Sequence, residues 1–253
     1  MLISYLVQMT INNEILDRVD SGINGYNDLL KGGYFKRTVN VVSGESGTGK
    51  TVFGSQFLYH GIRNNEKTLC IMTSEPAESL KKEMYSSFKW DFWEMEEAGM
   101  ITFVDIADPE LRLQKTIDMA PMELIMSFKK LLIRKIEEVK PDRVFIDAIE
   151  AMLLAIDSPY KLKTLVDDLF GVLRGHDITS IVTVGTTFNV ESVVEYGADS
   201  VTRLGRVVSG NNLQRSIYVA KLRGSGTLNE IRVMNISDNG ISILDQSPYM
   251  STV

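Results

Sequence analysis

A phosphate-binding loop is indicated by residues 44–51, which follow the pattern G-x-x-x-x-G-K-[ST]. Glycines let backbone N–H groups approach phosphate oxygens, and a helix that starts behind the loop adds partial positive charge. In such a loop Lys50 contacts the β- and γ-phosphates and the Thr51 hydroxyl binds Mg²⁺. The pattern therefore predicts a site for ATP or ADP with Mg²⁺. The expected nucleotide-binding residues are Gly44, Glu45, Ser46, Gly47, Thr48, Gly49, Lys50, Thr51 and Val52.

A carboxylate on a neighbouring strand usually completes the magnesium shell of such a site. Asp147 ends the apolar segment Arg143–Asp147, which has the composition of a buried parallel strand. Taken alone, an aspartate at the end of an apolar strand is an ordinary feature. Together with the loop, it predicts that Thr51 and Asp147 hold the metal ion.

Hydrolysis of ATP also requires a group that orients and deprotonates water. Glu75 follows the β-rich segment 68–73, at the carboxyl edge where nucleotides bind in open α/β sheets. Glu75 is therefore the candidate general base. The alternative is that Ser74 and Glu75 only stabilise the start of a helix. Glu150 is expected to be a surface or coupling residue.

The elements that must position these residues follow from the hydrophobic pattern. Short β-rich segments alternate with helical patterns, which predicts a mostly parallel sheet flanked by helices. The expected strands are 38–43, 68–73, 101–105, 143–147 and 179–184, and the expected helices are 51–64, 78–88, 121–140 and 161–175. Closely spaced strands at 200–208, 214–222, 230–236 and 240–244 then predict a C-terminal antiparallel extension, with a tight turn at Asp238-Asn239-Gly240.

Length and composition indicate one α/β domain. The chain has 253 residues, of which 44% are hydrophobic and 24% charged, as in ordinary globular proteins. We expect a ragged N-terminus at 1–12, one domain at 13–247 and a tail at 248–253. The net charge of −6 argues against a nucleic-acid coat protein.

The cysteine count and the N-terminal segment indicate where the protein works. Cys70 is the only cysteine, which excludes an intrachain disulfide and fits a reducing, cytoplasmic setting. The apolar segment Met1–Met9 is too short to span a bilayer, so no membrane insertion is expected.

Longer runs around these motifs carry a family resemblance. They are GINGYNDLLKGGYFKRTVNVVSGESGTGKTVFGSQFLYHGI, RVFIDAIEAML and YVAKLRGSGTLNEIRVMNISDNGISIL. With them the chain resembles KaiC-type and archaeal RadA-paralogue ATPases of the RecA superfamily, from about Gly22 to Leu244. The resemblance implies a RecA-like core that binds ATP between adjacent subunits of a homo-oligomer, a ring such as a hexamer.

The segment Lys221-Leu222-Arg223 matches an element that, by this resemblance, reaches the nucleotide of a neighbouring subunit. Residues two apart on a strand point to the same face, so Lys221 and Arg223 can present two cations to one polyphosphate. From the residues alone, a solvated strand edge is the alternative.

Two departures from the family limit what the resemblance implies. Glu75-Pro76 stands where family members usually have two adjacent glutamates, which implies slow turnover. Glu195-Tyr196 stands where the second domain of the clock protein has its phosphorylated Ser-Thr pair, which argues against clock-type autokinase activity.

Three functions compete. The leading one is a Mg²⁺-dependent ATPase whose nucleotide state controls assembly or partner binding, as in DNA recombination and repair by RadA paralogues. The second is an ATP-binding signalling or scaffold protein with negligible hydrolysis. The third is a DNA-binding module that would use arginines around the loop at 210–212, namely Arg203, Arg206 and Arg215.

Several other residues remain secondary candidates. Thr186 and Thr187 follow a core strand and are candidate sensors of the γ-phosphate. Clustered aromatic side chains can stack on a nucleobase, although such clusters are more often core or interface packing. The aromatic cluster comprises Phe88, Trp90, Phe92 and Trp93.

Overall fold

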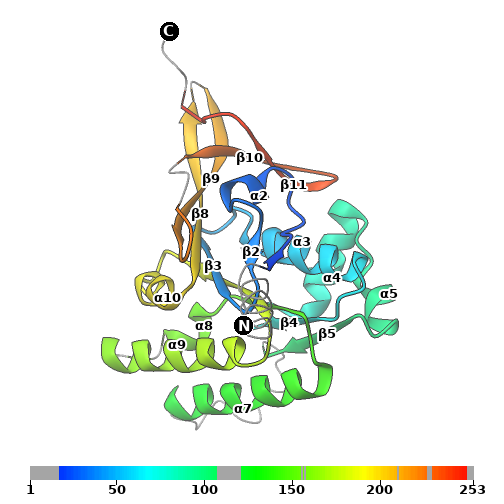
Figure 1. The fold of residues 1–253 in the computed structure, drawn as a ribbon, viewed down its shortest axis with the longest axis vertical. Coiled ribbons are helices and arrows are strands. Elements are labelled where there is room, and N and C mark those ends of the chain that lie inside the picture. The colour runs from blue at the N-terminus through cyan, green and yellow to red at the C-terminus, as the bar shows by residue number, and fades with distance from the viewer. Residues whose placement is uncertain are drawn as a thin grey trace, which may run out of the picture.

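The fold is built on a nine-stranded mixed sheet in the order β11-β10-β9-β8-β3-β7-β6-β4-β5 (Figure 1). This computed structural model describes residues 17–106, 121–154, 156, 158–209, 211–226 and 230–249. The strands are β3 (Val39–Gly44), β4 (Thr68–Met72), β5 (Ile101–Asp105), β6 (Arg143–Asp147), β7 (Thr179–Gly185), β8 (Ser200–Ser209), β9 (Asn212–Leu222), β10 (Arg232–Ser237) and β11 (Gly240–Leu244). The strands from β8 to β5 in this order run parallel, and β9, β10 and β11 extend the sheet antiparallel.

Helices cover both faces of the parallel part of the sheet (Figure 1). The helices are α2 (Tyr26–Leu29), α3 (Lys50–Arg63), α4 (Ala77–Phe88), α5 (Phe92–Glu97), α7 (Pro121–Val139), α8 (Glu150–Leu153), α9 (Pro159–Arg174) and α10 (Glu191–Gly197). One apolar core joins the sheet to α3, α4 and α5, and a second joins the opposite face to α7 and α9. A separate two-stranded sheet pairs β1 (Arg18–Val19) with β2 (Tyr34–Phe35).

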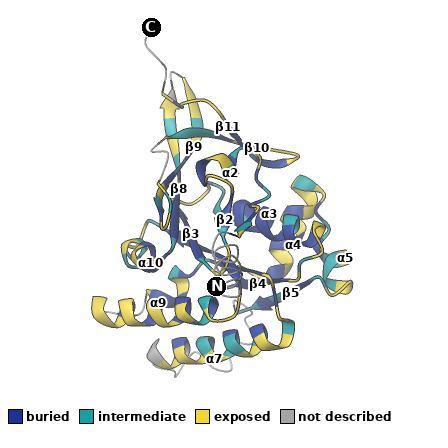
Figure 2. Ribbon diagram, viewed as in Figure 1, coloured by how far each residue is buried: buried dark blue, intermediate teal, exposed yellow. Residues whose placement is uncertain are grey.

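The central strands are buried along their whole length. Every residue of β3, β4, β6 and β7 is buried between the two helical layers, as Figure 2 shows. Helix α7 in contrast is buried along one stripe only, which contains Ile125, Phe128, Leu132 and Ile136. Continuous and striped hydrophobicity are the patterns expected of a covered parallel strand and of a surface helix. No helix within the described residues is long and apolar enough to cross a membrane.

The predicted fold class is confirmed, and the predicted strands and helices end within two residues of the observed ones. The predicted hairpin is also present, since Ser237 pairs with Gly240 across the Asp238-Asn239 turn. One detail differs, because β8 pairs parallel with β3 and therefore belongs to the parallel core. The short elements β1, β2, α5, α8 and α10 were not predicted.

Close packing between α3 and β6 leads to a stability prediction at Gly54. A β-carbon at Gly54 would overlap the fully buried ring of Phe145. Gly54→Ala should therefore lower the free energy of unfolding by about 1–3 kcal/mol, the usual effect of overpacking a core. Gly171→Ala is the matched control, because Gly171 lies in α9 with no atom within 4 Å of the added carbon. Alanine there should stabilise by about 0.5–1 kcal/mol. Equal stability changes in urea unfolding of the two variants would contradict this packing argument.

Candidate functional site

The loop between β3 and α3 borders a cavity of about 690 Å³. Gly47 and Gly49 have φ angles of 75° and 106°, a region that glycine adopts without a steric penalty. Helix α3 begins at Lys50, so its N-terminal turn also lines the cavity. The residues of the loop and helix that line it are Ser46, Gly47, Gly49, Lys50, Thr51 and Val52. The predicted strand, loop and helix are therefore arranged around one open space.

Lys50 is held against the loop itself. Its Nζ donates hydrogen bonds to the carbonyl oxygens of Gly44 at 2.8 Å and Glu45 at 2.9 Å. Burial lowers the pKa of Lys50, and the carboxylates of Glu150 and Asp147 oppose this shift. Lys50 therefore lines the cavity while its ammonium group is bonded to the loop carbonyls.

Thr51 and Asp147 are in direct contact although they lie 96 positions apart in the chain. The Thr51 hydroxyl donates to Oδ2 of Asp147 at 2.7 Å, and the Thr183 hydroxyl donates to Oδ1. Burial raises the pKa of Asp147, while the hydrogen bonds from Thr183 and Thr51 and the charge of Lys50 oppose the rise. A hydroxyl and a carboxylate are hard oxygen ligands of the kind that Mg²⁺ prefers.

This pair fits a magnesium ion that keeps several other ligands. The described residues contain no group of three or more His, Cys, Asp or Glu side chains that could hold a metal ion. Mg²⁺ usually binds through one or two protein oxygens, water and substrate phosphates rather than in an all-protein cage. Thr51 and Asp147 would supply the protein part of such a shell.

Glu75 lines the cavity from the end of β4 and is exposed. It does not cap the next helix, because the N-cap of α4 is Pro76, without a side-chain hydrogen bond. The N–H of Ala77 is instead bonded to Oδ2 of Asp105 at 2.9 Å. Glu75 therefore lines the cavity in front of the loop without capping α4 by a hydrogen bond.

The cavity has an acidic balance. Among the described residues that line it, the acidic side chains are Glu75, Glu83, Asp147 and Glu150, and the basic ones are Lys50 and Arg215. Burial raises the pKa of Glu83, and the nearby charges of Glu75 and Asp147 add to this rise. A polyphosphate would meet an excess of negative charge, which cations from outside these residues would have to offset.

The sequence indicated a surface or coupling residue at Glu150, and the surface alternative is wrong. It is half-buried at the start of α8 and lines the cavity beside Lys50. Burial raises the pKa of Glu150, and hydrogen bonds from the backbone N–H groups of Glu150 and Gly185 oppose the rise. The short helix that places it after β6 has only four residues and too weak a pattern to be read from sequence.

Of the other candidates, Thr187 and Phe88 reach the cavity, and Thr186 is not among the residues that line it. Trp90 is buried between Tyr59 and Phe88, with ring centroids 4.9 and 4.6 Å away. Trp90 and Phe92 thus belong to the core, as the commoner interpretation of aromatic clusters held.

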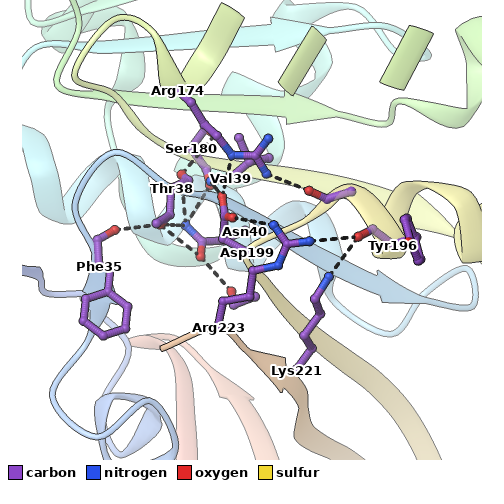
Figure 3. A network of polar contacts seen from close by, with 12 residues as sticks. Phe35, Thr38, Val39, Asn40, Arg174, Ser180, Tyr196, Asp199, Lys221 and Arg223 are labelled. Atoms are coloured by element: carbon purple, nitrogen blue, oxygen red, sulfur yellow. Dashed lines mark hydrogen bonds and ion pairs between the residues drawn. The ribbon is translucent and has the colours of Figure 1, made fainter. Parts of the chain in front are cut away.

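Lys221, in β9, and Arg223, directly after the end of β9, reach the same carbonyl oxygen of Tyr196 (Figure 3). Lys221 Nζ donates to the carbonyl oxygens of Glu195 at 3.2 Å and Tyr196 at 2.9 Å, at the end of α10. Arg223 donates to Tyr196 O at 3.4 Å and to Oδ1 of Asp199 at 3.2 Å. Asp199 also accepts hydrogen bonds from the Val39 N–H and from Arg174, so both cations dock on a fixed network.

These two cations line a second cavity, of about 520 Å³. Its lining residues are Ser192, Glu195, Tyr196, Val201, Arg203, Ala220, Lys221 and Arg223. None of them also lines the cavity in front of the phosphate-binding loop. The structure therefore does not bring Lys221 and Arg223 to the loop of their own chain.

Two of the three arginines considered for DNA contact, Arg203 and Arg206, are hydrogen-bonded within the chain. Arg203 pairs with the buried Glu195 at 2.6 Å, and Glu195 also accepts a hydrogen bond from Ser43 at 2.7 Å. Arg206 donates to the Ser46 carbonyl at 3.4 Å, and Arg215 lines the loop cavity. Arg206 and Arg215 are direct cross-strand neighbours in β8 and β9, whereas Arg203 lies apart from them against Glu195.

Comparison with known proteins agrees with this geometry. The family model described as "ATPase: KaiC" matches residues 19–248. A UPF0273 protein of Pyrococcus horikoshii is 31% identical over 233 residues, which cover 89% of this chain and 93% of that protein. The circadian clock oscillator protein KaiC of Parathermosynechococcus lividus is 28% identical over 90% of this chain, but only 42% of KaiC is covered.

A solved structure agrees as well. The KaiC-like protein PH0186 of Pyrococcus horikoshii superimposes with a TM-score of 0.77 at 27% identity, covering 90% of this chain and 99% of that one. This match supports the RecA-like architecture along nearly the whole of both chains. The loop, its strand and helix, and the extent of these matches show that the chain belongs to the KaiC family of ATPases.

Proposed function

We propose that this protein binds Mg²⁺–ATP in the cavity in front of Gly44–Thr51 and hydrolyses it to ADP and phosphate. The loop N–H groups and Lys50 hold the phosphates, and Thr51 and Asp147 hold the metal ion, which neutralises phosphate charge when bound. Glu75 accepts the proton of the attacking water. One domain, residues 13–247, carries this site.

The contact between Thr51 and Asp147 carries the proposal. It joins the loop to the end of β6 at 2.7 Å, so that the two predicted metal ligands share one place. A glycine-rich turn that matched the motif by chance would have no reason to meet a buried carboxylate there. The acidic balance of the lining also supports a bound divalent cation, because ATP adds further negative charge.

We also propose that the ATP site lies at a subunit interface and that nucleotide state controls assembly. Lys221 and Arg223 lie outside the loop cavity of their own chain. The ATP that they could reach is therefore the ATP bound to a neighbouring subunit. A partner protein or DNA would then sense the assembled state. Sizing the protein with and without ATP, with single-stranded DNA as a second variable, tests this part.

Lys50→Ala should abolish ATP binding, because the loop then loses its only cation near the β- and γ-phosphates. At an ATP concentration about 100 times Kd the parent should gain about 2.7 kcal/mol, or roughly 5–10 °C in Tm. Lys161→Ala, on the exposed side of α9, is the control and should keep the full shift. An undiminished shift in Lys50→Ala would refute the proposed site.

The same titration separates the two main functions. A signalling or scaffold protein with negligible hydrolysis would show the ATP-dependent shift without release of phosphate. Glu75-Pro76 is the feature that favours this alternative, since only one carboxylate follows β4. Phosphate release by the parent that Lys50→Ala abolishes would favour the ATPase.

A further inference from the structure

Glu150 has an unexplained carboxylate oxygen beside the proposed ATP site. Its Oε2 is buried and has no hydrogen-bond partner among the described residues. Leaving a buried polar atom unpaired costs free energy, and a charged one costs more, so such an atom in a native structure requires an explanation. The missing partner is expected to come from a bound molecule in the cavity that Glu150 lines.

The rest of the side chain is held in place. The backbone N–H of Gly185, at the end of β7, donates to the carboxylate. A β-carbon at Gly185 would lie 2.7 Å from Oε1, so glycine at this position leaves the room that the carboxylate occupies. Glu150 is therefore fixed between the ends of β6 and β7, with one oxygen bonded and the other, Oε2, buried at the cavity wall without a partner among the described residues.

The position of Glu150 restricts which donor group the unpaired Oε2 can accept a hydrogen bond from. Its charge acts on Lys50, the residue proposed to hold the β- and γ-phosphates, and Asp147 is also close enough to affect its pKa. A phosphate oxygen offers no proton to a carboxylate and would be repelled by it. Water next to the γ-phosphate offers the donor O–H that the unpaired Oε2 lacks.

Resting on the proposed ATPase function, we propose that Glu150 is a second acidic residue of the reaction, which positions the attacking water through Oε2. One O–H of the water donates to Glu150 and the other faces Glu75. The water oxygen then bonds to the γ-phosphorus while the bond from phosphorus to the β,γ-bridging oxygen breaks. The water proton passes to Glu75 and on to solvent, leaving ADP and inorganic phosphate.

This role predicts opposite effects on turnover and on binding. In Glu150→Gln the amide oxygen can still accept the hydrogen bond from the Gly185 N–H. The amide nitrogen, however, donates hydrogen bonds where Oε2 accepted one, so the attacking water would be held in another orientation. We expect kcat to fall about 100-fold, as for other losses of reactant orientation. ATP should bind about three- to ten-fold more tightly, because one negative charge near the polyphosphate is removed.

The matched control is Glu191→Gln. Glu191 also has a buried Oε2 without a hydrogen-bond partner in the described part of the chain, but it lies at the start of α10 and does not line the loop cavity. Glu191→Gln should leave both kcat and the affinity for Mg²⁺–ATP within about two-fold of the parent values. Glu150→Asp, which keeps the charge but shortens the reach, should lose turnover and bind ATP like the parent.

The measurements are phosphate release and the Kd for Mg²⁺–ATP by calorimetry, on proteins with matched Tm. An unchanged kcat in Glu150→Gln would overturn the inference while leaving the ATPase proposal intact. Parallel loss of binding and turnover would instead make Glu150 a structural residue. A parent that binds ATP without releasing phosphate would overturn both the role of Glu150 and the hydrolytic part of the proposed function, and a parent that fails to bind ATP would refute the site itself.

Discussion

Glu75→Gln is expected to lower the rate of ATP hydrolysis by about 100- to 10,000-fold while ATP binding persists. Glutamine keeps the size of the side chain but cannot take a proton from water. Glu75 is exposed at the cavity and does not cap α4, so the substitution should not disturb the fold. The readouts are phosphate release in single turnover and the ATP-dependent rise in Tm. Phosphate release should fall while the rise in Tm is retained.

The control for Glu75→Gln is Glu78→Gln, three positions further on. Glu78 binds Lys81 at 3.0 Å and the Trp93 indole at 3.2 Å, and it does not line the cavity. Its replacement should affect stability slightly and turnover not at all. If Glu75→Gln hydrolyses ATP at the parent rate, the general base is another residue, and Glu150 would be the next residue to test.

The parts of the fold that are long and strongly patterned were predictable from sequence. β3 is followed by the glycine loop and α3, and the burial of β6 and β7 on both faces favours the β-branched and apolar residues that dominate both segments. The apolar stripe of α7 likewise has helical period over 19 residues. These signals depend on local periodicity, which a single sequence contains in full.

The short elements depended on tertiary contacts and were missed. Helix α10, with seven residues, is held by burial of Val194 and by the Glu195 pair with Arg203. Helix α8, with four residues, would not form alone, because helix nucleation is unfavourable. The position of Glu150 follows from α8, so its approach to the cavity could not be read from sequence.

The candidate site likewise contains residues that the sequence pattern reveals and residues that only the fold reveals. Lys50, Thr51, Asp147 and Glu75 were found because each belongs to a motif or ends a strand, and parallel strands gather their carboxyl ends at one edge. Glu83 and Arg215 reach the same cavity from the middle of α4 and from β9. No local spacing distinguishes them from ordinary surface charges, so only the fold reveals them.

The interface proposal predicts that Lys221 and Arg223 act on the ATP of a neighbouring subunit. In their own chain they contact the end of α10 and Asp199, and their cavity shares no lining residue with the loop cavity. Cations supplied across an interface can raise the rate of phosphoryl transfer by about 10³–10⁵. The acidic lining of the loop cavity makes such outside cations more valuable here.

Lys221→Ala/Arg223→Ala should therefore reduce hydrolysis by a factor in that range, with the nucleotide site intact. Arg174→Ala is the control, because Arg174 shares the Asp199 network at 2.8 Å but does not line the second cavity. If loss of the network alone were responsible, Arg174→Ala would reduce the rate as much. Matching Tm values among the variants would exclude unfolding as the cause.

Mixing two inactive variants gives the sharpest test. A subunit with Lys221→Ala/Arg223→Ala retains Glu75, and a subunit with Glu75→Gln retains both cations. Some interfaces between the two variants therefore combine an intact Glu75 from one subunit with intact Lys221 and Arg223 from the other. In an equal, random mixture about one quarter of the interfaces would be of this kind, since each of two independent choices has a chance of about one half. ATP hydrolysis should rise to about one quarter of the parent rate and fall on dilution, as subunits separate. If light scattering shows mixed oligomers and the rate stays at that of the single variants, Lys221 and Arg223 do not act across the interface and belong to the edge of their own sheet.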